Sequence, residues 1–109
     1  MIESAHIDKY SHNNDLIPAL CETRSLFDCM SFLYETVSND TALILTADHE
    51  TGGLIKAATK EDISDDLYLF SSHTAADVPL FIKNFTYTCD GTPQNTEIFH
   101  ICKQLFKIK

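Results

Sequence analysis

The chain has 109 residues, of which 44% are hydrophobic and 22% charged, as is ordinary for one small globular domain. Sixteen acidic residues against eight Lys and Arg give a formal net charge of -8, which repels phosphate backbones and argues against a nucleic-acid partner. No run approaches the roughly 20 apolar residues of a membrane-spanning helix, so we predict no membrane segment.

The first part of the chain predicts a short strand followed by a long helix. Met1–Ile7 is short and mixed in character, and we interpret it as the end of a strand. Asn13–Ser38 predicts a helix, because capping residues precede it and Pro18 fits its first turn. Apolar side chains recur in it near helical spacing, at Ile17, Leu20, Phe27, Met30, Tyr34 and Val37.

The middle of the chain predicts further strands. Thr41–Ala47 is a compact apolar run with β-branched residues, typical of a strand that is covered on both faces in a parallel sheet. Asp48–Gly53 follows as a loop, in which two glycines allow unusual backbone angles. Leu67–Phe70 and Val78–Ile82 are two more short strand candidates.

The last part of the chain predicts a turn and an amphipathic helix. Asp90–Pro93 contains the turn, and Asn95–Lys107 has its apolar residues on one side. The alternation of strand and helix along the chain predicts an α/β fold with a layered sheet.

Four cysteines lie far apart, at Cys21, Cys29, Cys89 and Cys102. None forms a CxxC pair, which argues against a zinc ribbon or a thioredoxin-type motif. Cys21 and Cys29 are eight residues apart on the predicted helix, about 12 Å along its axis, and are too distant to bond to each other. We expect buried thiols that act as small apolar residues.

Candidate metal ligands gather where ligands sit in layered sheets, beyond the ends of the predicted strands. They are Glu3, Asp8, His12, Asp48, His49 and His73. Zinc takes imidazole nitrogen and carboxylate oxygen, and a helical spacing of four would put Asp8 and His12 on one face. A carboxylate such as that of Glu3 suits magnesium. Any single histidine is more often an ordinary surface residue, so these residues alone indicate only a metal site in an α/β fold.

Three stretches resemble the alkaline phosphatase family in order and spacing. They are MIESAHIDKYSH (Met1–His12), TADHETGG (Thr46–Gly53) and SHTAADVPLF (Ser72–Phe81). Asn95–Phe106 is similar to the family's final helix, so the resemblance covers essentially the whole chain. The resemblance implies a three-layer α/β/α sandwich, of which residues 1–109 would be the C-terminal, metal-binding part.

The resemblance also implies the roles of single residues. One zinc ion would be held by Asp8, His12 and His73, a second by Asp48 and His49, and a magnesium ion by Glu3. Lys9 would place a positive charge near the phosphate or the magnesium, although a solvated lysine is the alternative. Ser4 and Ala5 replace a glycine pair that is common in the family.

The family's serine nucleophile and phosphate-binding arginine match no residue of this chain, so no catalytic residue is assigned. Neither Ser11, Ser71 and Ser72 nor Arg24 lies in the corresponding motifs. We therefore expect a fragment, or a reading frame that starts at an internal Met. Met1–Glu3 shows no signal peptide.

The complete enzyme would hydrolyse small phosphate monoesters with two zinc ions and one magnesium ion. By resemblance it could form a homodimer and act in the periplasm, outside the cell or at its surface. Two alternatives stay open. The chain could be a non-catalytic metal-binding fragment or pseudoenzyme, or a subunit completed by a separately encoded N-terminal half.

Overall fold

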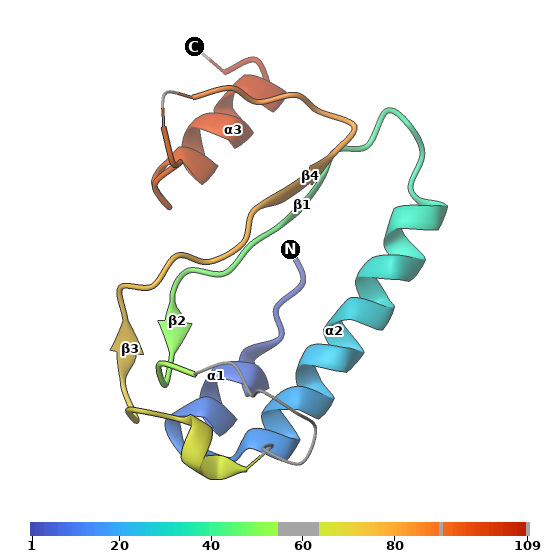
Figure 1. Cartoon of the computed structure of the whole chain (residues 1–109). Helices are drawn as coiled ribbons and strands as arrows, with labels where there is room; N and C mark the ends of the chain where they lie inside the picture. The colour runs from blue at the N-terminus through green and yellow to red at the C-terminus, as the bar shows by residue number, and fades with distance from the viewer. Residues whose placement is uncertain (55–63, 90, 109) are drawn as a thin grey trace.

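The computed structural model describes residues 1–54, 64–89 and 91–108. Within these residues the elements follow in the order α1 (Ala5–His12), α2 (Leu16–Thr36), β1 (Leu43–Leu45), β2 (Glu50–Thr51), η2 (Asp65–Leu67), β3 (His73–Thr74), β4 (Phe81–Lys83) and α3 (Glu97–Leu105). In Figure 1, α1 and the β2–β3 pair lie at one end of the molecule, α3 lies at the other, and α2 runs beside them.

The strands form one returning ribbon. β1 pairs antiparallel with β4, with Ile44 opposite Ile82, and β2 pairs antiparallel with β3, with Thr51 opposite His73. The chain runs from β1 to β2 and comes back from β3 to β4, so both pairs are antiparallel (Figure 1). The prediction that Thr41–Ala47 forms a strand of a parallel sheet is therefore wrong for the described strands, because β1 pairs antiparallel with β4. The three-layer sandwich itself stays a prediction.

The predicted strand end at Met1–Ile7 is wrong, because helix α1 already begins at Ala5. The helix packs on α2, and this contact outweighs the weak local preference of so short a segment. Asn14 reverses the chain between the two helices with φ 57°, a left-handed conformation that asparagine tolerates.

Helix α2 confirms the predicted helix, with ends two or three residues shorter, and Pro18 lies in its first turn. Helix α3 confirms the closing helix in the same way. Of the predicted turn at Asp90–Pro93, Asp90 lies outside the described residues, and the chain bends at 91–92. No helix in the described part of the chain is long and apolar enough to cross a membrane.

Two of the predicted short strands differ from the structure. Leu67–Phe70 is wrong as a strand: a 3₁₀ turn ends at Leu67, and the N–H groups of Leu69 and Phe70 both donate to the carbonyl of Gly52. Val78–Ile82 overlaps β4, which begins only at Phe81, after Pro79, a residue without an N–H to donate. Strands β2 and β3 were not predicted.

The core is small and the chain is extended. The buried side chains among the described residues are those of Ser11, Leu16, Ala19, Tyr68 and Ile101. The radius of gyration is 16.0 Å, whereas a compact domain of this length has one of about 13 Å. Many large apolar side chains, including Phe27 and Phe32 on α2, remain exposed.

The cysteines correct one prediction and confirm another. All four are free, so Cys21 and Cys29 are not bonded to each other, as their helical spacing required. The expected burial is wrong for three of them, since Cys21, Cys29 and Cys89 are exposed and Cys102 is half-buried. With so little of the chain covering α2, its cysteines have no core to enter.

Candidate metal centre

Helix α1 presents Asp8 and His12 to the same side, because residues four apart lie one turn above each other. The Oδ1 atom of Asp8 lies 3.4 Å from Nε2 of His12. The helical spacing that the sequence analysis required for a shared ligand site is therefore present, and both side chains are only half-buried.

Strand β3 adds a third donor from a distant part of the sequence. His73 Nε2 lies 3.0 Å from His12 Nε2 and 3.6 Å from Asp8 Oδ1. His12 Nδ1 lies 2.7 Å from the carbonyl oxygen of Ser71, which can only accept, so the proton of that nitrogen donates to it. The Nε2 atom of neutral His12 therefore carries a free lone pair toward Asp8 and His73.

These three donor atoms have the spacing that zinc requires. Donors around a tetrahedral zinc ion, at 2.0–2.2 Å from the metal, lie about 3.4 Å from one another. The three separations here are 3.0, 3.4 and 3.6 Å. The first donor group, Asp8 with His12 and His73, thus fits zinc in both chemistry and distance.

Asp48 and His49 form a second donor pair beside the first group. Asp48 Oδ2 lies 3.4 Å from His49 Nε2, and the carboxylate is almost fully exposed. The His49 ring stacks on the ring of His73, with centroids 3.5 Å apart. Donor atoms of Asp8, His49 and His73 also lie within 4.8 Å of one another, a looser grouping than the first. We therefore place His12, and not His49, with Asp8 and His73.

The hydroxyl of Thr51 connects the two groups. Its oxygen donates to Asp8 Oδ1 at 2.6 Å and lies 3.2 Å from His49 Nδ1. The hydrogen bond from Thr51 is the largest cause and lowers the pKa of the Asp8 carboxyl. Burial opposes it, and His12, His49 and His73 lower this pKa further when they are protonated. Asp8 is therefore ionised, as a metal ligand must be.

Glu50 fastens the strand that carries Thr51. Its carboxylate accepts the backbone N–H of Gly53 at 2.9 and 3.1 Å, the N–H of Leu54 at 3.3 Å, and the hydroxyl of Thr74. The contact with Thr74 ties β2 to β3, and so fixes the loop of His49 against His73. The sequence analysis missed Glu50 and Thr51. Thr51 could have been found if this stretch had been predicted as a strand, because residues two apart in a strand point to the same side, and His49 lies two residues before Thr51.

Two predicted site residues make no side-chain contact with this cluster. Glu3 and Lys9 are exposed, and neither side chain makes a hydrogen bond or ion pair with another described residue. Glu3 is thus not paired with Lys9 or with Arg24, which instead bonds Asp28. The magnesium role of Glu3 and the phosphate-side role of Lys9 stay predictions.

The geometry defines a cluster of histidine and carboxylate side chains whose donor atoms are close enough to hold a cation. Comparison with known proteins gives the family of the chain: the sequence model of the alkaline phosphatase family, described as "Alkaline phosphatase", matches residues 1–90. The chain belongs to the alkaline phosphatase family. It is 34% identical over 58 residues to the repressible alkaline phosphatase of Saccharomyces cerevisiae, across 50% of this chain. It spans about a tenth of the length of that curated relative, and no solved structure matches it.

Proposed function

We propose that this chain supplies the zinc-binding part of an enzyme that hydrolyses small phosphate monoesters. The observation that carries the proposal is the convergence of Asp8 Oδ1, His12 Nε2 and His73 Nε2 at 3.0 to 3.6 Å. Two imidazoles and one carboxylate suit zinc better than magnesium, which prefers oxygen ligands only. Membership of the alkaline phosphatase family supports the substrate class.

A second zinc ion is assigned to Asp48 and His49, and a magnesium ion to Glu3. The 3.4 Å separation of Asp48 Oδ2 and His49 Nε2 supports the first assignment, because it again equals the spacing of two donors on one ion. The magnesium assignment rests on family resemblance, which puts Glu3 five residues before Asp8. Two bound zinc ions would supply electrostatic stabilisation of the attacking and leaving oxygens of the phosphoryl group.

The chain's own residues would bind and orient. Asp8, His12 and His73 would hold a zinc ion through donor atoms that lie 3.0 to 3.6 Å apart, and Lys9 on the same helix would bring a positive charge to the phosphate side. We further propose that β1 and β4 belong to the sheet of an α/β/α sandwich, and that the complete enzyme is a homodimer. Exposed apolar side chains around these strands, such as Phe81, support a larger assembly.

A zinc titration tests the metal assignment. Isothermal titration of the metal-free chain should show zinc binding that His12→Ala weakens by about 100-fold or more, since one of three protein ligands is lost. The matched control is His6→Ala, on the same helix and exposed, which should leave the affinity unchanged. Equal losses in both variants, or no binding at all, would overturn the proposal.

A turnover assay tests whether the chain carries its own nucleophile. A non-catalytic metal-binding module is the second candidate function. The donor atoms of Asp8, His12 and His73 converge within this chain, which favours metal binding, but no residue of the chain is assigned as nucleophile. With zinc and magnesium added, the chain alone should therefore not hydrolyse p-nitrophenyl phosphate at a measurable rate. Robust activity that His49→Ala abolishes would show that the chain carries its own nucleophile.

A further inference from the structure

The side chain of Thr51 lies between residues that the sequence separates widely. Its hydroxyl contacts Asp8 of α1, 43 residues earlier, and His49, two residues earlier, at 2.6 and 3.2 Å. The threonine is half-buried on β2, where Glu50 on the opposite side of the strand bonds Thr74 and the backbone of Gly53. The strand that carries the Thr51 hydroxyl is therefore anchored by Glu50, and the hydroxyl itself by Asp8 and His49.

The single proton of this hydroxyl decides the direction of both contacts. An ionised carboxylate only accepts, so Thr51 must donate its proton to Asp8. No proton of Thr51 then remains for His49. The 3.2 Å contact can be a hydrogen bond only if His49 Nδ1 carries a proton and donates it to the threonine oxygen.

This hydrogen bond determines the state of the other ring nitrogen of His49, Nε2. With the proton of neutral His49 on Nδ1, its Nε2 atom keeps a free lone pair, and this is the atom 3.4 Å from Asp48 Oδ2. Which ring nitrogen can bind a metal is set by the hydrogen bond that the other makes. Neutral histidine in water favours the proton on Nε2, so the Thr51 contact selects the rarer tautomer.

We propose that Thr51 is a positioning residue that holds His49 with Nε2 free for a cation and links this histidine to Asp8. The inference deepens the proposed function and rests on its assignment of His49 to the second zinc. The Asp8 oxygen that accepts from Thr51 also faces His12 and His73. Two consecutive hydrogen bonds, from His49 to Thr51 and from Thr51 to Asp8, therefore join the two donor groups.

The test reads the tautomer directly in the metal-free chain. Long-range ¹H–¹⁵N spectra of the imidazole rings, recorded in mildly alkaline solution so that neutral rings are observed, should show His49 with its proton on Nδ1. Thr51→Val removes the hydroxyl and should move the proton to Nε2 in most molecules. Thr51→Ser keeps the hydroxyl and should retain the wild-type tautomer.

Zinc affinity supplies the second readout. Thr51→Val should weaken binding at the site of His49 by about 10- to 100-fold, the usual effect of losing the partner of a ligating histidine, and Thr51→Ser should restore it. The matched control is Thr46→Val, in the segment before Asp48, whose hydroxyl bonds only the carbonyl of Ala47 and which should match the wild type.

The outcomes separate this inference from the proposed function. A wild-type chain whose neutral His49 carries its proton on Nε2 overturns the role of Thr51 without any variant. So does a folded Thr51→Val chain with unchanged tautomer and zinc affinity. If the wild-type chain binds no zinc, the metal assignment fails, while the tautomers of the wild type and of Thr51→Val still decide whether Thr51 positions His49.

Discussion

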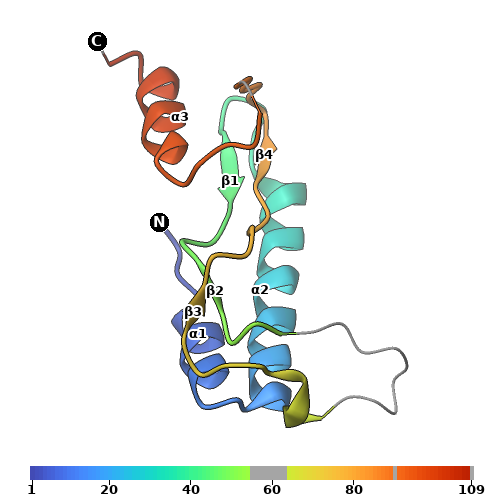
Figure 2. The same cartoon turned by 60° about the vertical axis from the view of Figure 1, so that its left-hand side comes forward.

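The two ends of the molecule are held together by different interactions. The histidine end comprises α1, β2 and β3, and the apolar end comprises β1, β4 and α3 (Figures 1 and 2). At the histidine end, side-chain hydrogen bonds join residues 43 to 61 positions apart in the sequence. At the apolar end, β1 and β4 pair through their backbones, and Phe81 and Phe99 are more than half exposed.

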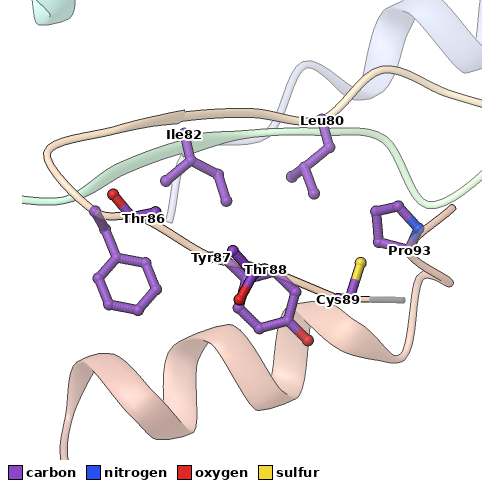
Figure 3. A pocket seen from close by; sticks show the side chains of 8 residues that line it. Leu80, Ile82, Thr86, Tyr87, Thr88, Cys89 and Pro93 are labelled. Carbon is purple, nitrogen blue, oxygen red and sulfur yellow. The ribbon is translucent and has the colours of Figure 1, made fainter. Parts of the chain in front are cut away.

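The apolar end also has side-chain hydrogen bonds between residues 43 to 49 positions apart. Side chains of β4 and of the segments on either side of it line a hollow, and Figure 3 shows the Tyr87 side chain extending from the segment after β4 toward helix α3. The phenol of Tyr87 donates to Glu97 at the start of α3. The Lys83 ammonium group donates a hydrogen bond to the backbone carbonyl of Tyr34 on α2. It also lies over the Tyr34 ring, 4.2 Å from the ring centroid.

The two ends of the molecule suit two different roles, the binding of a metal ion and contact with another protein surface. A metal centre needs donor atoms fixed within a few tenths of an ångström, and short polar contacts over long sequence distances provide that. Large exposed apolar surfaces are typical of regions that another protein surface covers. The histidine end is thus organised by short contacts between polar side chains, whereas the strands and helix of the apolar end have the character of an interface.

The largest expected effect concerns two glycines, one at each end. Gly52 has φ 94°, and a Cβ atom there would lie 2.4 Å from the ring of buried Tyr68. Gly91 has φ 77°, but a Cβ atom there would meet nothing within 4 Å. Gly52→Ala should therefore lower the free energy of unfolding by about 3 kcal/mol, and Gly91→Ala by about 1 kcal/mol, the backbone strain alone.

Urea denaturation of the metal-free chain, followed by circular dichroism, measures both glycine variants. Similar losses for the two would show that the histidine end is packed no more tightly than the apolar end. The contrast between the ends would then rest on polar contacts only.

A smaller effect is expected at the buried hydrogen bond between Ser11 and Tyr68, whose oxygens are 3.0 Å apart. Tyr68→Phe should lower the free energy of unfolding by about 1 kcal/mol, because the Ser11 hydroxyl loses its partner in a buried position. Ser11→Ala should cost a similar amount, and the double variant less than the sum of the two. Strictly additive losses in a double-mutant cycle would show that this bond does not help to hold α1.

The smallest effect appears only in alkali. The hydrogen bond to Glu97 raises the pKa of Tyr87 to about 12, so the folded state favours the neutral phenol. This contribution to stability is fully present below pH 10, near the pKa of a free tyrosine, and is lost as the pH rises through about 12. Absorbance at the tyrosinate band should show one late-titrating tyrosine that Glu97→Gln returns to about pH 10. If one tyrosine still titrates late in the Glu97→Gln variant, the raised pKa is not caused by the hydrogen bond to Glu97.

Sequence patterns predicted α2 and α3 well, missed α1, and predicted the strands poorly. Helix α2 could be predicted because its apolar residues recur at helical spacing over 21 residues. Asp8 and His12 could be paired on the condition that their segment is helical, because residues four apart in a helix lie on the same face. The strands of the described chain are two or three residues long, too short to show a period, and β3 was therefore missed. Glu50 and Thr51 were overlooked because their partners, Thr74 and Asp8, lie 24 and 43 residues away.

By itself, the sequence determined the family, the candidate ligands and the length of the long helix, since these follow from residue types and local spacing. The family resemblance grouped Asp8 with His12 and His73, and only the tertiary structure decided through which contacts these and the other candidate ligands meet. The return of the chain through β3 brings His73 to 3.0 Å from His12, and β2 puts Thr51 between Asp8 and His49. Such contacts depend on where the backbone crosses itself, and residues 61 positions apart carry no local signal of that crossing.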